Sequence, residues 1–500
     1  MDAVDACAPS APSAAASAPG EPLLRPLRAL FRGTPALSAP ARSAPVRAAL
    51  VRAAVLAAGV LGAAGASAWS NHALGSGPAL AALPPLVALA PVTVESLESF
   101  LAAEGARLEA LLDDEERWAR EHVPTYPPRP EALRYTVAGA VGARGVVDAG
   151  ELRRRFVAAV RIAPDARLAL YLQRGPAAPP ADARAPLPAR AVSTLPHEAA
   201  MATTRFVALH AGEAVAPIEV LGTASDEPDY GLDLGLWEDN GTPQGRIYGF
   251  GRQPFGNPAL ALGSQAPFHM GFYHESWIVY AAAGFLKRTY PEYRIHLWRT
   301  LARHALATGH DYWGWRFAGW AVHYLQDLTQ PYHARVMPGV ATVRMLWINA
   351  LYLAGRPLAR EHAVTLVSNR HLVLENFQRT AMLAAALDRA HAALLFDALA
   401  GDAAAAPPAY DDDMPRRLVS RRAAEAADAI DRTIAASFPA HDVDDPAFDF
   451  GASEHGIDLD AVLARDNARA RQAVLRALAP RLADFGVYTR AFVRSLLPAR

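Results

Sequence analysis

The sequence predicts an all-α fold, a multi-helix bundle with long loop insertions. Helical spacing of apolar residues dominates the chain, and no stretch alternates apolar and polar residues for long, as a half-buried strand would. The chain has 500 residues, 52% of them hydrophobic, which is ample for a large buried core. Its 49 Lys and Arg nearly balance its 50 Asp and Glu. No overall field therefore favours a polyanion, and we expect no stable nucleic-acid partner.

Residues 1–68 are predicted to be a leader that precedes the folded domain. Residues 1–48 are rich in Ala, Pro and Ser and are expected to be unstructured. Three arginines then precede sixteen uncharged residues that end in Ala66-Ser67-Ala68, the small-x-small pattern that signal peptidases accept. This pattern predicts a secreted or periplasmic protein whose mature chain starts at Trp69. The alternative is a membrane anchor over residues 49–68, although its apolar run is short against the roughly 20 residues of a spanning helix.

The first half of the mature chain is predicted to combine helices with long loops. Residues 94–122 have the apolar spacing and charged faces of one or two amphipathic helices. Residues 174–190 are rich in Pro and Ala and are predicted to be a loop. Residues 213–266 are rich in Gly, Pro and Asp and are predicted to be a long ordered loop region, which within a compact domain is usually functional.

The second half is predicted to be a series of helices. They extend over residues 275–435, with breaks near Pro291, Pro331, Pro338 and residues 403–408. Residues 459–499 are predicted to form a last helical pair. We expect residues 69–500 to make up one domain.

Several aromatic and His side chains in this half have an expected structural role. Trp313, Trp315 and Trp320 have helical spacing and are predicted to be core residues rather than a platform on which bases stack. His304 and His310 lie in an amphipathic stretch that contains arginines, and both are predicted to be solvated.

A pair of metal-ligand residues stands out on an apolar helical stretch. His323 and Asp327 are four residues apart, so both side chains leave one face of a helix. Pro331 then ends that helix, and the turn can return His333 to the same pocket. A lone His–Asp pair at this spacing is more often a surface interaction. Here apolar neighbours flank the pair, and on a buried helix metal ligation would compensate the costly carboxylate.

A second pair, His371 and Glu375, repeats the same spacing on another predicted helix. The one cysteine, Cys7, lies in the leader, so a zinc ion would have to be held by His, Asp and Glu. The chain contains 16 histidines, which is a sufficient pool. The two pairs and His333 together offer five ligands of the kind that zinc accepts.

The two motifs resemble those of the zinc-dependent phospholipase C and single-strand nuclease superfamily. The segment from His323 to Ala334 matches the hallmark His-Tyr-Leu-Gly-Asp-x-x-Gln-Pro-x-His-Ala, with Gln326 in the Gly place. The segment from His371 to Phe377 matches the His-x-x-x-Glu-Asn-Phe of the phospholipase branch, whereas the nuclease branch tends to have Asp in place of Glu. The resemblance implies a helical bundle with three zinc ions at the bottom of one cleft.

The resemblance also implies roles for individual residues. Asp327 would bridge two zinc ions, one shared with His323 and the other with His72 and with the amine and carbonyl of Trp69. The remaining zinc ion would be held by His333, His371 and Glu375.

Two further ligands are implied upstream of His323. Asp229 is our choice for the carboxylate, and it would also orient or deprotonate the attacking water. His269 and His274 are both candidates for the imidazole: His269 follows a bulky residue, as in the family, while His274 has the more familiar distance to His323. We favour His269.

The implied activity is hydrolysis of a phosphodiester, with a phospholipase C reaction on phospholipid headgroup esters as the first expectation. Such an enzyme would contact a membrane surface transiently, and we expect a monomer. The alternatives are a secreted single-strand nuclease that uses the same metals and a non-catalytic helical envelope protein with a structural zinc site. Residues 125–220 and those beyond 440 have no counterpart in the family, so the substrate is the least determined part of this prediction.

Overall fold

The computed structural model describes residues 71–142, 147–178, 183–195, 201, 203–256, 262–402, 406–453 and 456–498. It is 64% helix and 4% strand, which confirms the all-α class. The predicted leader, the anchor alternative over residues 49–68 and Trp69 lie outside the described residues. Within the described part, no helix is both long and apolar enough to cross a bilayer.

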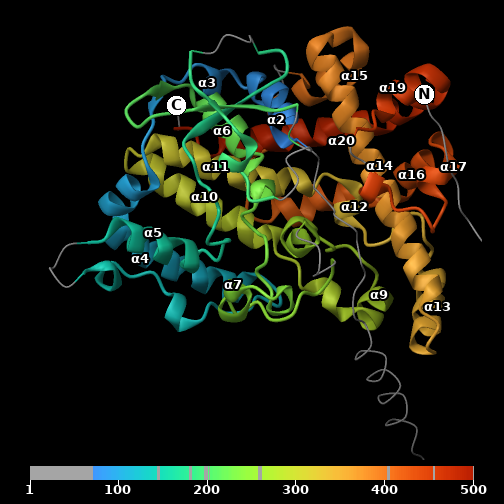
Figure 1. Ribbon diagram of the computed structural model, residues 1–500, viewed down its shortest axis with the longest axis horizontal. Coiled ribbons are helices and arrows are strands. Elements are labelled where there is room, and N and C mark those ends of the chain that lie inside the picture. The colour runs from blue at the N-terminus through green and yellow to red at the C-terminus, as the bar shows by residue number, and fades with distance from the viewer. Residues whose placement is uncertain are drawn as a thin grey trace, which may run out of the picture. The chain divides into compact units, whose positions relative to one another are not determined.

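Helix α11 (Asp311–Asp327) lies at the centre of the fold and is buried along nearly its whole length (Figure 1). It pairs with α10 (Pro291–Ala307), and α6 (Pro217–Ala224) and α20 (Ala468–Arg494) pack against it. Gly319 permits the close approach of α6, because a Cβ at this position would lie 2.5 Å from the Cβ of Ala224. Trp313, Trp315 and Trp320 are buried, as predicted for core residues.

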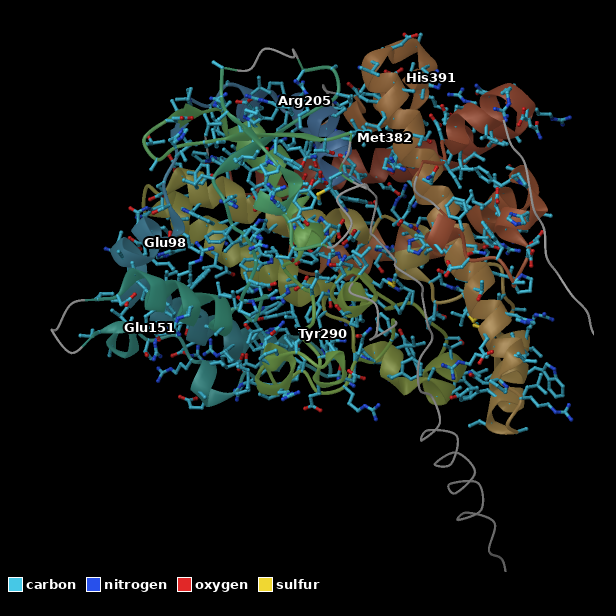
Figure 2. The ribbon with its side chains drawn as sticks, in the orientation of Figure 1. Glu98, Glu151, Arg205, Tyr290, Met382 and His391 are labelled. Atoms are coloured by element: carbon cyan, nitrogen blue, oxygen red, sulfur yellow. The ribbon has the colours of Figure 1, made fainter. Side chains whose placement is uncertain are left out.

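The other α-helices surround this centre. They are α2 (His72–Ala81), α3 (Pro84–Val87), α4 (Leu97–His122), α5 (Ala149–Ala159), α7 (Pro243–Ile247), α8 (Ala266–His269), α9 (Trp277–Ala282), α12 (Pro331–Ala334), α13 (Thr342–Leu353), α14 (Leu358–Leu387), α15 (Ala393–Ala400), α16 (Arg421–Ser437), α17 (Ala440–Val443), α18 (Phe450–Ser453) and α19 (Leu459–Asp466). An ion pair of 2.8 Å joins Glu98 of α4 to Arg153 of α5, and Figure 2 labels Glu98.

Short 3-10 helices and one π-helix connect many of these elements. The described ones are η1 (Glu131–Leu133), η2 (Ala138–Ala140), η3 (Ala189–Ala191), η5 (Glu227–Tyr230), η6 (Glu238–Asn240), η7 (Leu262–Gln265), η8 (Gly284–Lys287), η9 (Arg389–Ala392) and the π-helical turn η10 (Pro415–Ser420).

The strands are short and antiparallel. β1 (Val92–Thr93) pairs with β5 (Ala214–Val215), with Val92 opposite Val215. β4 (Arg205–Ala208) lies between β2 (Tyr171–Arg174) and β3 (Pro186–Leu187).

Most of the predicted helices are present. Within the predicted segment 94–122, residues 97–122 form the single helix α4, which Ser96 caps by accepting from the backbone amide of Ser99. The break at Pro331 and the final pair α19 and α20 are also confirmed.

Two predictions are wrong. The predicted long loop region 213–266 contains α6, α7 and several single turns, because Pro217 starts a short apolar helix that packs on α11. His304 and His310 are mostly buried rather than solvated: their side chains are 14% and 18% exposed, and they lie 2.8 and 3.0 Å from Glu104 and Glu95. In the predicted loop 174–190, β3 and the start of η3 form short ordered segments.

Candidate metal centre

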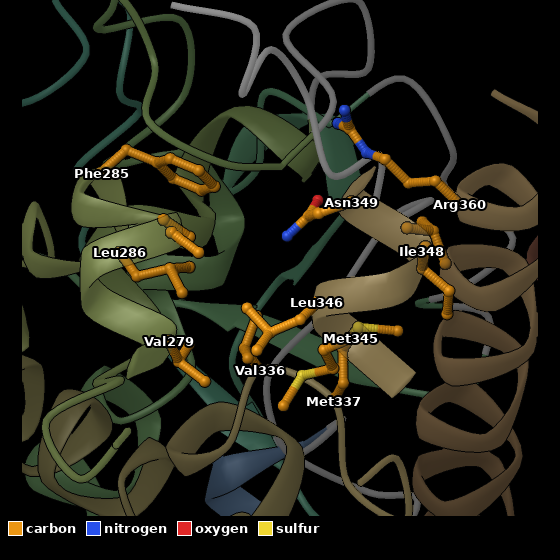
Figure 3. A pocket seen from close by; sticks show the side chains of 13 residues that line it. Val279, Phe285, Leu286, Val336, Met337, Met345, Leu346, Ile348, Asn349 and Arg360 are labelled. Carbon is orange, nitrogen blue, oxygen red and sulfur yellow. The ribbon is translucent and has the colours of Figure 1, made fainter. Parts of the chain in front are cut away.

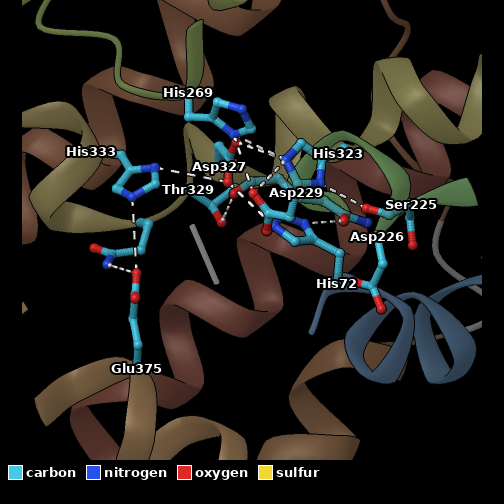
Figure 4. A network of polar contacts seen from close by, with 12 residues as sticks. His72, Ser225, Asp226, Asp229, His269, His323, Asp327, Thr329, His333 and Glu375 are labelled. Atoms are coloured by element: carbon cyan, nitrogen blue, oxygen red, sulfur yellow. Dashed lines mark hydrogen bonds and ion pairs between the residues drawn. The ribbon is translucent and has the colours of Figure 1, made fainter. Parts of the chain in front are cut away.

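Helices α11, α12 and α14 carry five of the candidate ligands. His323 and Asp327 share one face of the last turns of α11. The turn that follows leads into α12, which returns His333 toward the end of α11 (Figure 4). His371 and Glu375 lie one turn apart on α14. All five side chains are buried.

Three more candidates come from short elements. His72 is the first residue of α2, Asp229 lies in η5, and His269 ends α8. The start of α2 is held in two ways. Asn71, with a positive φ of 95°, accepts from the backbone amide of Leu74, and Asp226 accepts from that of Ala73 at 3.0 Å.

A first group consists of one atom from each of Asp229, His269, His323 and Asp327. Nδ1 of His269 lies 2.9 Å from Oδ2 of Asp327 and 3.0 Å from Nε2 of His323. The distance from Nε2 of His323 to Oδ2 of Asp327 is 3.4 Å. Oδ1 of Asp229 lies 3.7 Å from each of the two imidazole nitrogens. Atoms at these separations can share one ion.

The second group uses the other oxygen of Asp327. Oδ1 lies 3.3 Å from Nε2 of His72, and both side chains are fully buried. The rings of His72 and His323 are 4.0 Å apart between centroids. The two oxygens of Asp327 thus point to different histidines, which is the arrangement that a bridging carboxylate requires. Trp69, the other ligand implied for this group, lies outside the described residues.

The third group consists of His333, His371 and Glu375. Oε1 of Glu375 lies 2.7 Å from Nε2 of His371 and 3.9 Å from Nε2 of His333. The two imidazole rings are nearly perpendicular, with centroids 5.1 Å apart. Gln330 donates to Oε1 of Glu375 at 3.0 Å and so helps to fix that carboxylate.

The outer nitrogens of His323 and His72 are held by hydrogen bonds, and that of His269 faces a carboxylate, which fixes the direction of the rings. Nδ1 of His323 lies 2.7 Å from the carbonyl oxygen of Ser225, and Nδ1 of His72 lies 2.8 Å from Oε1 of Gln326. Nε2 of His269 lies 3.4 Å from Oδ2 of Asp233. Such outer partners select the tautomer whose inner nitrogen carries a lone pair, as in metal sites.

Several buried polar atoms of these groups have no hydrogen-bond partner within the described structure. They are Nε2 of His72, Nε2 of His371, Oδ1 of Asp327 and both ring nitrogens of His333. Leaving a buried polar atom unsatisfied costs about 1–3 kcal/mol, and such atoms are rare in native proteins. Their convergence on two neighbouring points fits residues that ligate metal ions.

Burial keeps three of the imidazoles neutral, which is the form that binds metal. It lowers the pKa of His333 to about 4 and those of His323 and His371 well below the usual value. For His269 burial also opposes the charge, but hydrogen bonds to Asp233 and Asp327 raise its pKa to about 10.

The carboxylates of the first group differ in charge state. Burial raises the pKa of Asp229 to about 7, although the charges of His269 and His72 oppose the rise. Asp327 has a pKa well below the usual value, because the surrounding histidines overcome the effect of its burial.

His274 does not belong to these groups. Its ring is half-buried, and its Nε2 lies 3.0 Å from the backbone oxygen of Arg416. The chain leaves α8 directly after His269, so only the earlier of the two candidates reaches the first group.

Sequence reasoning missed three residues that support the ligands. Asp226 holds the start of α2, Gln326 orients His72, and Asp233 faces His269 while it forms a 2.6 Å ion pair with Arg294. Asp226 and Asp233 lie close to Asp229 in the sequence; the leucines on either side of Asp233 are a sign of its burial, whereas Asp226 lies between Ser225 and Glu227 and has no such sign.

Three buried groups of His, Asp and Glu in the described chain could therefore hold metal ions. They comprise His72, His323 and Asp327; Asp229, His269 and His323; and His333, His371 and Glu375. Comparisons of the chain with protein-family models, with curated proteins and with solved structures found no match.

Proposed function

We propose that the protein is a zinc-dependent hydrolase of phosphoric diesters that binds three zinc ions and acts as a phospholipase C. The observation that carries the proposal is the first group, whose ligand atoms are spaced as around one tetrahedral ion. With bonds of about 2.1 Å, a tetrahedral zinc ion separates its ligand atoms by about 3.4 Å. Five of the six distances between its four atoms, all except the one between Asp229 and Asp327, range from 2.9 to 3.7 Å.

The chemistry of the donors supports zinc in particular. Imidazole nitrogens and carboxylate oxygens are ligands that zinc accepts, and no thiolate is needed. The two-sided use of Asp327 supports a pair of neighbouring ions. Zinc in such a site lowers the pKa of water toward neutrality and neutralises charge that develops on a phosphoryl group.

Within this proposal Asp229 holds the attacking water. Its side chain is 15% exposed, whereas Asp327 is fully buried, so Asp229 is open to a water or a substrate. Gln265 donates to Oδ1 of Asp229 at 3.2 Å and leaves Oδ2 for another partner. A carboxyl whose pKa lies near neutrality can accept a proton from water under ordinary conditions.

An apolar cavity beside the third group supports a lipid substrate. It is lined by His371 together with Phe255, Met270, Phe272 and Met337. A diacyl lipid needs an apolar surface next to the reacting phosphate, and this cavity provides one. The alternative nuclease needs aromatic faces on which bases stack. The three tryptophans of α11 cannot supply them, because all three are buried in the core.

The proposal is tested with His323→Ala and a matched control, His274→Ala, which removes an imidazole outside the three groups. Zinc content is measured by mass spectrometry, and activity is measured on phosphatidylcholine micelles and on single-stranded DNA. We expect His323→Ala to lose zinc and activity while His274→Ala keeps both.

Each other outcome has a definite meaning. Full activity and zinc content in His323→Ala would refute the metal centre. Activity of the unmodified protein on DNA alone would replace the phospholipase with a nuclease. Full zinc occupancy with no activity on either substrate would favour a structural metal site.

A further inference from the structure

Helices α9 and α13 present apolar side chains to solvent as well as to the core. Trp277 of α9 is 77% exposed, and Val343 and Trp347 of α13 are 78% and 63% exposed. Leu353 and Leu358, which flank the turn between α13 and α14, are also exposed. We call these five residues the α9/α13 face. The two helices contact each other and lie together in Figure 1.

Helix α13 carries large apolar side chains on its outer as well as its inner face. Its inner face carries the buried Met345 and Ile348, while Val343 and Trp347, four residues apart, occupy the outer face. Arg344 is its one charged residue. A surface helix of a water-soluble protein normally has a polar outer face, and a helix without one is covered by an apolar partner or by lipid.

The charges around this face are mostly positive. Residues 335–360 contain four arginines and no acid. Arg344 and Arg356 are exposed, and within the described chain neither forms an ion pair with an acid. Lys287 is exposed near α9, and Glu361 is an exposed acid that follows the segment. Tryptophan beside unpaired basic residues matches the boundary of an anionic bilayer.

An apolar cavity lies behind this face and adjoins the cavity beside the metal centre. It lies between α9 and α13 and is lined by Val279, Phe285, Leu286, Met345 and Leu346 (Figure 3). Its empty space is about 620 Å³, part of it open to solvent. It shares the lining residues Val336, Met337 and Val364 with the cavity that reaches His371.

We propose that the α9/α13 face docks onto an anionic lipid bilayer and that the two adjoining cavities receive an acyl chain drawn from it. The second clause rests on the proposed function, since it delivers a lipid phosphate to the metal centre. The first clause stands on the exposed face and its charges alone.

The test measures binding of the full chain to vesicles of phosphatidylcholine with and without phosphatidylglycerol, by co-sedimentation. We expect binding to the anionic vesicles, and a loss of about tenfold or more in Trp277→Ala/Trp347→Ala, because each tryptophan loses its buried area. Arg344→Gln is expected to weaken binding to anionic vesicles about fivefold and to change nothing on phosphatidylcholine alone. Leu387→Ala, which shortens an equally exposed side chain at the other end of α14, is the matched control and should bind as the unmodified protein does.

Two further measurements distinguish failure of the proposed function from failure of the docking face. Zinc content and hydrolysis of bis(p-nitrophenyl) phosphate, a soluble diester, report on the metal centre without a membrane. Absence of both with vesicle binding retained would refute the proposed function and leave the docking face standing. Equal vesicle binding by the double tryptophan variant and the unmodified protein would overturn the docking face. So would a dimer in sedimentation velocity that the double variant converts to a monomer, because the face would then be covered by a second copy.

Discussion

Replacement of Gln326 by leucine tests whether the metal centre depends on the residues that orient its ligands. Gln326 is buried beside Asp327, and its Oε1 accepts from Nδ1 of His72 at 2.8 Å. Its Nε2 donates to the hydroxyls of Ser76 and Thr489 at 2.9 and 3.0 Å. Gln326→Leu removes all three hydrogen bonds while it retains the approximate volume of the side chain.

The size of the effect follows from these three bonds. Each of the three buried partners left unsatisfied costs about 1–3 kcal/mol, so the free energy of unfolding should fall by about 3–9 kcal/mol if none finds a substitute. The His72 ring also loses the neighbour that selects its tautomer, and loss of such a partner weakens metal binding about 10–100-fold. We therefore expect both lower stability and weaker binding of the zinc ion at His72.

The two effects are measured separately. Urea unfolding of the metal-free protein gives the stability change, and competition with a chromophoric chelator gives the zinc affinities. Gln378→Leu is the control, because Gln378 is a buried glutamine of α14 whose side-chain amide donates to the sulfur of Met382 rather than to a metal-ligand residue. Unchanged zinc affinities in Gln326→Leu would refute the reasoning, even if its stability fell.

Three other predictions follow from the same structure. Zinc binding should release more protons at about pH 6 than at about pH 8. Zinc must displace the proton of His269, whose pKa is about 10, at both pH values, but it must displace that of Asp229, whose pKa is about 7, mainly at the lower pH. Calorimetry in buffers of different ionisation enthalpy measures the number of protons released, and equal release at both pH values would contradict the prediction. Gly319→Ala should destabilise the protein by about 1–3 kcal/mol in urea unfolding, because the new Cβ would overlap α6. An unchanged unfolding midpoint would show that α6 can move away. Arg294→Met should lower the free energy of unfolding, measured with urea, by about 3–5 kcal/mol, because Asp233 would remain buried without its cation. A variant as stable as the unmodified protein would show that Asp233 takes up a proton at no cost.

The local spacing of residues in the sequence was enough to predict most of the helices and the two pairs of candidate metal ligands on them. His323 with Asp327 and His371 with Glu375 each depend on one turn of helix, and spacing alone places such residues on one face. The return of His333 required one more assumption, a turn at Pro331, which the structure contains.

The other features of the site depend on long-range packing, which local sequence pattern does not predict. His72 reaches Asp327 because α2 packs against α6 and α20, and these contacts cannot be deduced from periodicity. His269 and His274 are five residues apart, and the end of α8 separates them, which no pattern in the segment signals. The apolar outer face of α13 was also missed, because a mostly apolar helix looks the same in sequence whether its outer side is covered or open.

The amide of Gln326 also has a consequence for the order in which the protein matures. It joins Ser76, 250 residues earlier in the chain, to Thr489, 163 residues later. A folding chain in which α20 has not yet packed lacks the hydrogen bond to Thr489, one of the two that hold the amide of Gln326, and Gln326 in turn orients His72. We therefore expect a metal ion to bind firmly at His72 only after the carboxy-terminal helix has packed.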